Sequence, residues 1–291
     1  MDAESFESAT VDPIDRSLLL ERTGLASFEH LAEVGSTMDR AREIAGAARA
    51  GLPAAVVADR QTQGRGRQGA RWWQPPGSLT VSLVLDVATV AAAVSDGSVS
   101  VASAANQGVP PAIWSLACGV ALAEAVAAVE PAAAPLVRWP NDIEARGRKL
   151  AGILVESAPG GRVIFGIGVN TTGTTADAPA ALRDRIVTLP DLTGRRLPRQ
   201  ALLVEFLPRF LRLLSEIDAD PRRLIARYRP LCALDGHPLT IHRAGGTLRG
   251  VCRGIAADGA LVLDTPAGRV AVISGSLTDP AEVWRGDASA S

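Results

Sequence analysis

The sequence predicts an α+β fold in which helices back a mixed and largely antiparallel sheet, followed by a small β-barrel. Helical and extended patterns do not alternate regularly in the first part of the chain, which argues against a doubly wound parallel sheet. From about Gly236 the pattern changes to short alternating runs separated by glycine-containing turns, which is typical of a small all-β domain. We therefore predict two domains, over residues 1–234 and 235–291.

The first elements of the larger domain follow from capping residues and periodicity. Ser36 and Thr37 are candidate N-caps of an amphipathic helix. Residues 54–59 are predicted to form a buried strand, and residues 79–86 alternate hydrophobic and polar side chains with the period of a half-buried strand. The arginine- and glycine-rich residues 64–77 therefore form a loop between two strands.

The later elements have equally local signals. Residues 113–130 are alanine-rich and hydrophobic on nearly every face, which predicts a helix buried between layers. A second, amphipathic helix is predicted over residues 199–217, and Pro208 should bend or interrupt it. The small polar residues 95–111 are expected to form a flexible surface insertion. Three short β-rich runs are predicted at residues 136–142, 149–157 and 162–170.

Composition excludes a global attraction to nucleic acid or to anionic membranes. Thirty basic residues nearly balance 31 acidic ones and leave a net charge of −1, so any basic site is local. Three widely spaced cysteines and an acidic start without a signal peptide's apolar core predict a reduced, cytoplasmic protein. The longest hydrophobic stretches are interrupted before they reach bilayer length. His30, His237 and His242 have no ligand spacing with the cysteines, so no zinc site is expected.

The stretch "GRGRQGARWW", which begins at Gly64, carries the first chemical signal. Its glycines allow the backbone to approach a ligand closely, while Arg65 and Arg67 offer planar forks suited to phosphate or carboxylate. Trp72 and Trp73 offer faces on which a purine could stack. The stretch matches neither a Walker-type phosphate loop nor a dinucleotide fingerprint. It therefore indicates either a nucleotide site or a solvated basic loop anchored by its tryptophans, and we expect it to be mobile when empty because its arginines repel one another.

Three further motifs each have a functional and an ordinary interpretation. In "RWPND", Asn141 and Asp142 are either ligand-binding residues or turn formers. Lys149, immediately before the strand "LAGILVES", is either a catalytic cation or an edge charge. The glycines of "GIGVNTTG", Gly166 and Gly168, mark either room for a ligand or close strand packing.

Taken together with "GST" and in this order, the motifs resemble those of biotin–protein ligases over residues 34 to 173. The resemblance implies a ligase domain of the class II synthetase type with a C-terminal SH3-like barrel. It implies that ATP activates the biotin carboxylate to biotinoyl-AMP, and that the biotinoyl group then passes to a lysine of the biotin carboxyl carrier domain of acetyl-CoA carboxylase or a related carboxylase. Only about thirty residues precede the first motif, too few for a winged-helix domain, so we expect no DNA binding. The oligomeric state stays open, a homodimer included.

The resemblance also implies a role for each matching residue. Biotin's ureido head would be bound by Ser36, Thr37 and Gln61, and its ring would be walled by the strands around Leu83 and Leu154. The glycines that give biotin room and backbone donors would be Gly64, Gly152, Gly166 and Gly168. Biotin and the phosphates would both contact Arg65, Arg67 and Lys149, and the ATP and adenylate side would also include Trp72, Asn141, Asp142 and Asn170.

Lys149 and Arg67 are the expected catalytic pair. An ammonium between the carboxylate and the α-phosphate would relieve the repulsion between these two anions as charge develops. Mg²⁺ would arrive with ATP, held mainly by phosphate oxygens and water, and its protein ligands are not predicted. Asp142 would either help to position Mg²⁺ or accept a proton from the carrier lysine.

Two departures and two rivals qualify this interpretation. The family commonly has an arginine where this chain has Ala70, although Arg71 follows at once, and the family's "GEVSLR" ending becomes "ISGSLTDP". The nearest rival is a lipoate or octanoate ligase or transferase with a similarly placed lysine. The other is a non-enzymatic nucleic-acid-binding module, whose binding would depend strongly on salt.

Overall fold

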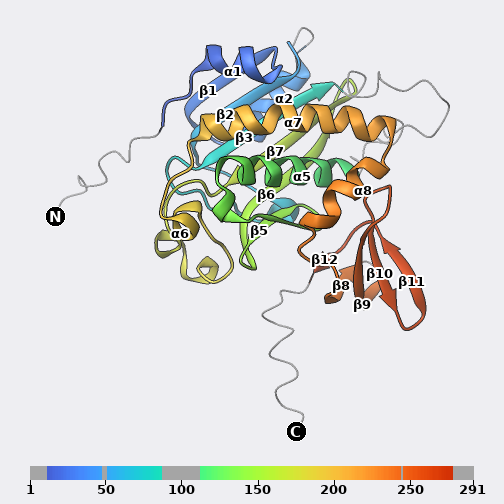
Figure 1. The fold of residues 1–291 in the computed structure, drawn as a ribbon. Coiled ribbons are helices and arrows are strands. Elements are labelled where there is room, and N and C mark those ends of the chain that lie inside the picture. The colour runs from blue at the N-terminus through green and yellow to red at the C-terminus, as the bar shows by residue number, and fades with distance from the viewer. Residues whose placement is uncertain (1–11, 48–50, 87–111, 244, 278–291) are drawn as a thin grey trace.

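The computed structural model describes residues 12–47, 51–86, 112–243 and 245–277. The expected insertion at residues 95–111 lies outside these ranges. Two sheets organise the described chain (Figure 1), a large one crossed by helices and a smaller one at its C-terminal end.

The large sheet has seven strands in the order β1-β2-β3-β7-β6-β5-β4. Only β1 and β2 pair in parallel, and the other pairings are antiparallel. The predicted mixed, largely antiparallel sheet is therefore confirmed. The strands are β1 (Ser27–Val34), β2 (Ala54–Gln61), β3 (Leu79–Asp86), β4 (Leu136–Arg138), β5 (Asp142–Ala145), β6 (Arg148–Ala158) and β7 (Arg162–Val169).

Helices cover the sheet on both faces. On one face α5 and α7 run side by side across the strands (Figure 1), and their buried side chains form the main core with those of the sheet. On the other face α2 packs against β3 and β7 through a smaller cluster around Met38 and Ala41. The α-helices are α1 (Arg16–Thr23), α2 (Thr37–Gly46), α5 (Ala112–Val129), α6 (Leu189–Thr193), α7 (Arg199–Ala219) and α8 (Arg222–Tyr228). Short 3-10 turns are η1 (Arg67–Gly69), η2 (Pro131–Ala133), η3 (Thr175–Asp177), η4 (Ala180–Leu182) and η5 (Arg229–Leu231).

Helix α5 corrects one expectation from the sequence. Its 18 residues have a mean hydropathy of 1.9, and within the described chain it is the one helix long and apolar enough to cross a bilayer by length and composition alone. The expectation that every hydrophobic stretch would be too short was therefore wrong. In this fold, however, 67% of the helix is buried between the sheet and neighbouring helices, which accounts for its apolar surface.

Strand β3 is buried along its whole length up to Asp86, so the expected half-buried strand is wrong. Leu79, Val81, Leu83 and Leu85 face the main core, while α2 covers the face that carries Thr80, Ser82 and Val84. These hydroxyls are satisfied inside the protein, since Thr80 Oγ1 donates to Ala58 O at 3.0 Å and Ser82 Oγ donates to Thr37 Oγ1 at 2.8 Å. The polar positions of the alternating pattern therefore face an interior, not solvent.

Helix α7 continues through Pro208, so of the two expected effects the interruption did not occur, and a bend stays a prediction. Phe206 and Phe210 flank the proline, stack with ring centroids 5.5 Å apart, and are fully buried. Burial of these rings on the sheet offsets the hydrogen bond that proline cannot donate.

The C-terminal sheet has five antiparallel strands in the order β11-β10-β9-β8-β12. They are β8 (Pro238–Arg243), β9 (Gly246–Ile255), β10 (Leu261–Thr265), β11 (Gly268–Val272) and β12 (Ser276–Leu277). The predicted β-rich C-terminal domain is therefore confirmed, whereas closure of this sheet into a barrel and the boundary between residues 234 and 235 stay predictions.

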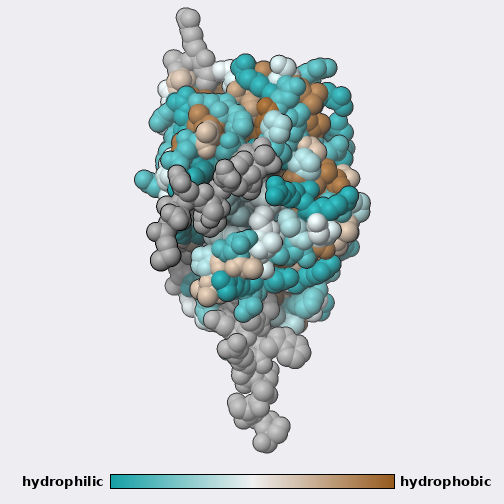
Figure 2. Space-filling model, turned by 90° about the vertical axis from the view of Figure 1, so that its left-hand side faces the viewer, coloured by the Kyte–Doolittle hydropathy of each residue, from teal (hydrophilic) through white to brown (hydrophobic). Residues whose placement is uncertain are grey.

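Residues that contact across this junction are distant in sequence. Trp139 Nε1 donates to Gly259 O at 3.1 Å, and the side chains of Cys232 and Cys252 lie against each other. All three cysteines are free thiols. Hydrophilic residues predominate on the face shown in Figure 2, where hydrophobic ones form only small patches.

Candidate active site

A cavity of about 800 Å³ lies on the sheet face that α2 covers, and the C-terminal domain forms part of its wall. From that domain come His242, Gly275, Ser276 and Leu277. The predicted residues that line it are Ser36, Thr37, Gln61, Arg65, Arg67, Trp72, Asn141, Asp142, Lys149, Gly152, Gly166, Gly168 and Asn170. Gly64 lies beside the wall instead, where its carbonyl accepts a hydrogen bond from Trp72 N at 3.0 Å.

Ser36, Thr37 and Gln61 line one part of the cavity, which we call the polar recess, and Ser82 lies behind Thr37, fully buried. Ser36 caps α2 by accepting from Met38 N. Gln61 Oε1 accepts from Thr37 N at 2.8 Å and from Thr37 Oγ1 at 3.1 Å. Ser36, Thr37 and Ser82 are each at most 3% exposed. The recess therefore holds hydroxyl and amide groups in fixed positions within an otherwise apolar interior.

The floor of the cavity is a patch of glycines on two paired strands. Gly152 of β6 lies opposite Gly168 of β7, and Leu154 lies opposite Gly166. A Cβ at Gly168 would lie 2.5 Å from the indole of Trp72. The glycines therefore let protein side chains approach the sheet closely, which neither interpretation of the motif had named, and the room they leave for a ligand stays a prediction.

Of the two leucines expected to wall the biotin ring, only one lies in this cavity. Leu154 lines it, whereas Leu83 is buried in the main core on the opposite face of β3. That expectation was wrong because Leu83 and Ser82 are neighbours on one strand and point to opposite faces. A Cβ at Gly166 would lie 2.5 Å from Met38 Sδ, so Met38 covers this part of the floor instead.

Lys149 stands at the start of β6 with its backbone fixed on both sides. Its N–H donates to Arg185 O and its carbonyl accepts from Val187 N, both at 2.9 Å. Lys149 Nζ lies 2.7 Å from Asp142 Oδ1 and 5.8 Å from the centre of a Trp72 ring. Asp142 Oδ1 is buried and makes no aligned hydrogen bond, so this contact is an ion pair. Lys149 is therefore a cavity residue and not a solvated edge charge.

The arginine- and glycine-rich loop is a small hairpin that its own backbone closes. Arg65 bridges to Arg71, and Gly66 N donates to Ala70 O at 2.7 Å. Arg65 makes two hydrogen bonds to the Asp39 carboxylate at 2.6 and 2.8 Å, and Arg67 donates to Asn141 Oδ1 at 3.0 Å. The expectation that the arginines repel one another until a ligand anion arrives was therefore wrong, because Asp39 neutralises one of them.

Pairing lowers the pKa of Asp39 and raises the pKa of Arg65, as expected for two groups of opposite charge. The hydrogen bond from Arg65 is the largest influence on Asp39 and holds the pKa of that carboxyl below its ordinary value. The same bond raises the pKa of Arg65. Both side chains are thus charged at neutral pH, and an arriving phosphate meets an arginine that already has a carboxylate partner.

The cavity is strongly positive in a chain whose net charge is −1. Its wall carries two carboxylates, Asp142 and Glu144. Against these stand six cations, Arg65, Arg67, Arg71, Arg138, Lys149 and Arg185. Such an excess of cations favours a ligand with several negative charges.

Two buried polar atoms on the cavity wall have no partner in the described structure. They are Trp72 Nε1, a donor, and Asn170 Oδ1, an acceptor, whereas Asn170 Nδ2 donates to Val187 O at 3.0 Å. Buried polar groups are rarely left without a partner in a complete site. A ligand that both accepts and donates hydrogen bonds, as a nucleobase does, would satisfy them.

The donor set fits a magnesium ion that arrives on phosphate, not one held in a protein cage. In the described ranges no cluster of three His, Cys, Asp or Glu side chains could hold a metal. Asp142 and Glu144 lie two positions apart on β5 and both line the cavity. Mg²⁺ is commonly bound by one or two carboxylates together with phosphates and water.

Several cavity residues were not predicted from the sequence. Met38, Arg138, Arg185 and His242 line the wall, and Asp39 holds Arg65. Met38 and Asp39 follow directly on "GST", so their place beside a predicted site residue was the available signal. Arg185 and His242 belong to segments without a motif. Arg71 also lines the wall, next to the departure at Ala70.

Comparison with known proteins agrees with this architecture. The Biotin/lipoate A/B protein ligase family model matches residues 34–171, and the Biotin protein ligase C terminal domain model matches residues 236–276. A biotin–[acetyl-CoA-carboxylase] ligase of Mycobacterium tuberculosis is 33% identical over 278 residues, which cover 90% of this chain and 94% of the relative. One of Paracoccus denitrificans is 32% identical over 222 residues, 74% of this chain and 85% of the relative.

The fold also has solved counterparts. The biotin protein ligase of Aquifex aeolicus, in complex with biotin and ATP, superposes with a TM-score of 0.71 at 24% identity, covering 87% of this chain and 97% of that one. Fold and cavity thus define a protein ligase of the biotin and lipoate class. Given the two relatives above 30% identity, the chain belongs to the biotin protein ligase family and is a ligase enzyme.

Proposed function

We propose that the cavity activates biotin with ATP to biotinoyl-5′-AMP and then transfers the biotinoyl group to a lysine of a biotin carboxyl carrier domain. The observation that carries this proposal is the polar recess, which opens into a cavity whose wall has six cations against two carboxylates. The recess suits the uncharged polar head of the acid, and the cations suit its carboxylate together with a triphosphate.

The polar recess favours biotin over lipoate or octanoate. The Thr37 hydroxyl and the Gln61 amide line the cavity and are groups that can hydrogen-bond a ureido group, while Ser82 supports Thr37 from behind. The apolar end of lipoate or octanoate would add no hydrogen bond to these groups, whereas each hydrogen bond to a ureido head contributes about 0.5–1.5 kcal/mol.

Lys149 is the group we assign to the first chemical step. The biotin carboxylate oxygen attacks the α-phosphorus of ATP, the bond to the bridging oxygen breaks, and pyrophosphate leaves. The two reactants are anions, so an ammonium between them lowers the barrier as charge shifts to the phosphoryl oxygens. Arg67 and Arg65 hold the phosphate oxygens, for which Arg65 exchanges its Asp39 partner.

The second step needs a proton acceptor. The carrier lysine amine attacks the carbonyl carbon of the mixed anhydride, AMP leaves, and the amine loses a proton. Asp142, already paired with Lys149, is either that acceptor or a magnesium ligand. Mg²⁺, when bound with ATP, screens the phosphate charges, and Asp142 and Glu144 are the carboxylates that would hold it. Asn170 and Trp72 would contact the adenine side.

The partner, place of action and assembly follow from this function as predictions. The partner is the carrier domain of acetyl-CoA carboxylase or a related carboxylase, the predicted compartment is the cytoplasm, and no operator DNA or membrane is expected to bind. A homodimer also stays a prediction.

One assay tests the proposal. Exchange of labelled pyrophosphate into ATP is measured with biotin, lipoate or octanoate supplied singly. Exchange with biotin alone is expected. Exchange with lipoate or octanoate alone would show that the substrate is misassigned, and salt-dependent retention of DNA or RNA without any exchange would favour a nucleic-acid-binding module.

A further inference from the structure

Strand β2 extends beyond its pairing with β3. The last paired residues are Ala58 and Thr80, yet β2 continues to Gln61. At this point the side chain of Gln74, on the segment that leads from the arginine- and glycine-rich loop into β3, takes the place of a partner strand. Gln74 Nε2 donates to Asp59 O at 3.0 Å, and Gln74 Oε1 accepts from Gln61 N at 3.0 Å.

A primary amide is the one kind of side chain suited to this place. It must donate to a carbonyl and accept from an N–H at the same time, as a peptide group does in a β-ladder. The two partners fix which end of the amide carries the oxygen. An apolar side chain can do neither, and a carboxylate would face the Asp59 carbonyl without a proton to donate.

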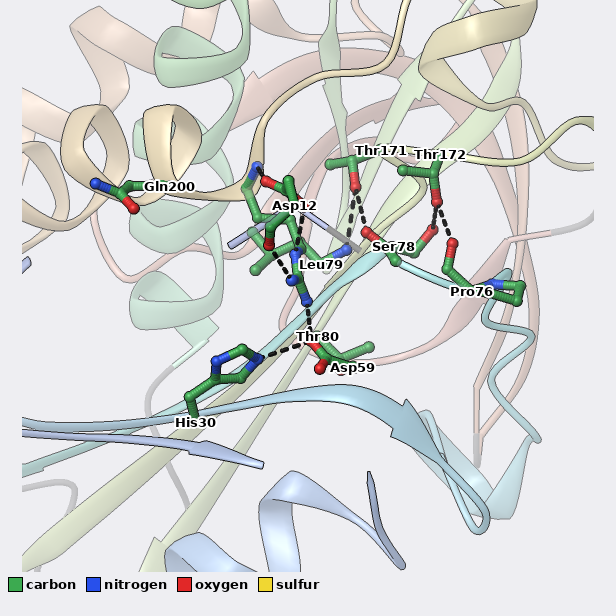
Figure 3. A network of polar contacts seen from close by, with 12 residues as sticks. Asp12, His30, Asp59, Pro76, Ser78, Leu79, Thr80, Thr171, Thr172 and Gln200 are labelled. Atoms are coloured by element: carbon green, nitrogen blue, oxygen red, sulfur yellow. Dashed lines mark hydrogen bonds and ion pairs between the residues drawn. The ribbon is translucent and has the colours of Figure 1, made fainter. Parts of the chain in front are cut away.

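The residue that receives one of these hydrogen bonds is itself fixed from the other side. The Asp59 carboxylate accepts from Arg199 Nη1 at 2.6 Å and lies 2.7 Å from His30 Nε2 (Figure 3). Arg199 is fully buried and also binds Asp12. Burial raises the pKa of Asp59, but the hydrogen bonds from His30 and Arg199 outweigh it and hold that pKa below its ordinary value. Asp59 is therefore held in place by its own side-chain contacts, and its carbonyl in turn fixes the position of the Gln74 amide.

We call the two hydrogen bonds from the Gln74 side chain to the backbone of Asp59 and Gln61 the bridge. Its Gln61 end leads into the polar recess. Gln61, held at its backbone N–H by Gln74, uses its side-chain oxygen to accept from both the N–H and the hydroxyl of Thr37. Gln74 itself does not line the cavity. It can therefore affect a ligand only through the residues it holds.

We propose that Gln74 is a positioning residue that fixes Gln61 and, through it, the arrangement of the polar recess that selects the acid substrate. This rests on the proposed function, because it assumes that the recess binds the head of biotin. The consequence is selective: loss of the bridge weakens biotin binding, while the ATP side and the chemical step at Lys149 are untouched.

The test compares Gln74→Met, which keeps the length of the side chain but removes the hydrogen bonds to Asp59 and Gln61 together with the longer one to Thr80 Oγ1 at 3.4 Å, with Gln74→Ala and wild type. Since a hydrogen bond contributes about 1 kcal/mol, we expect the KM for biotin to rise about five- to tenfold in both variants, with kcat and the KM for ATP nearly unchanged. Gln63→Ala is the matched control, because Gln63 is an exposed glutamine two residues from Gln61 and takes no part in the bridge. It should leave the KM for biotin unchanged.

A double-mutant cycle separates positioning from general weakening. In a Gln61→Ala background, Gln74→Met should add little to the KM for biotin, because the two residues act through one path. An additive effect, an unchanged KM for biotin in Gln74→Met, or an equal loss in kcat would each overturn the proposal.

Hydrogen exchange at the Gln61 amide, measured without substrates, tests the bridge independently of function. Gln74→Met should speed exchange there, whereas unchanged exchange would overturn the proposal. Two results together would separate the proposals. If wild type shows no biotin-dependent pyrophosphate exchange, while amide hydrogen exchange at Gln61 is faster in Gln74→Met, then the proposed function is wrong but the structural role of the bridge is supported.

Discussion

Hydrogen bonds fix the backbone of Lys149, while its ammonium forms an ion pair with Asp142 that an anionic substrate can replace. Hydrogen bonds to the segment of residues 185–187 hold its main chain, while its ammonium pairs with Asp142 and lies over the Trp72 ring. A cation held this way is preorganised, so little reorganisation is needed when two anionic substrates arrive.

Lys149→Gln should therefore lower the rate of biotinoyl-AMP formation by about 10²–10³, because it keeps the side-chain length and removes the charge. The rate of pyrophosphate exchange and the melting temperature check this. Arg148→Gln is the control, since Arg148 is the neighbouring cation and does not line the cavity. A stable Lys149→Gln variant with a near-normal rate would show that the role is misassigned.

Asp218 illustrates the opposite case, a buried carboxylate whose Oδ2 has no hydrogen-bond partner among the residues that the structure describes. It is 9% exposed, its Oδ2 makes no hydrogen bond, and burial raises its pKa above the ordinary value of 3.8. The folded protein thus binds this proton more tightly than the unfolded chain. The resulting stability is present below the unfolded pKa and is lost as pH rises through the folded pKa.

Asp218→Asn should consequently stabilise the protein at neutral pH, where the native carboxylate is charged and buried. The gain should shrink at acidic pH, because the raised pKa lets the native side chain become protonated as the pH falls. Urea unfolding at neutral and at acidic pH measures it, and the exposed Asp184→Asn serves as the control. A loss of stability at neutral pH would mean that Asp218 has a favourable charged contact.

At the scale of elements, the arginine- and glycine-rich hairpin is the part most sensitive to ligands. Its backbone bridge and the Asp39 and Asn141 contacts give it a defined conformation in the described structure. A substrate phosphate must compete with Asp39 for Arg65, and a ligand can satisfy the unpaired Trp72 Nε1. Substrates should therefore tighten the hairpin in steps.

Hydrogen exchange of the amides of residues 64–77 tests this in three states: protein alone, with biotin, and with a non-hydrolysable adenylate analogue. Protection should increase from the first state to the third, because each ligand adds contacts to the arginines or the tryptophan. Equal protection in all three would indicate a preformed loop that the substrates do not tighten.

An element could be predicted from the sequence when its own residues carry a capping or periodicity signal. Helix α2, strands β2 and β7, and the apolar helix α5 were predicted from caps and periodicity. Strand β1 was not, because it lies at the sheet edge and most of its residues are partly exposed, which leaves no clear alternation. Strand β5 was also missed, since its four residues follow the turn of "WPND" directly.

At the scale of the whole molecule, one glycine holds the C-terminal domain against the ligase domain. Gly259 has a φ of +85°, its carbonyl accepts from the indole of Trp139, and a Cβ there would lie 2.6 Å from Ile113 N at the start of α5. Trp139 lines the cavity, so the turn that carries Gly259 supports the cavity wall.

Gly259→Ala should destabilise the protein by more than the cost of its backbone conformation, which is about 1–3 kcal/mol. Gly160→Ala is the matched control, because Gly160 has a φ of +77° and open space around its Cβ position. Urea unfolding measures the loss of unfolding free energy in each variant. The additional loss in Gly259→Ala is the contribution of the contact between the Gly259 turn and α5. Equal losses in the two variants would mean that the turn can move away from α5 without cost.

The sequence by itself determined the chemical groups of the site and the elements that carry them. The arginine forks, the lysine at the start of β6, the glycines of β7 and the N-cap at Ser36 are local features, set by residue type and by spacing of a few positions. Thirteen of the fourteen residues predicted to contact biotin or ATP line one cavity and Gly64 lies beside it, whereas of the two leucines named for the apolar wall only Leu154 lines it.

Only the tertiary structure decided how these groups are held. The Asp39–Arg65 and Asp142–Lys149 pairs, the Gln74–Gln61 bridge and the entry of His242 into the wall each join segments that have no periodic relation in the chain. Helix α2 likewise decided that both faces of β3 are buried. Caps, turns and periodicity report interactions over a few residues, whereas these contacts depend on how distant surfaces pack, and that packing leaves no pattern in a single sequence.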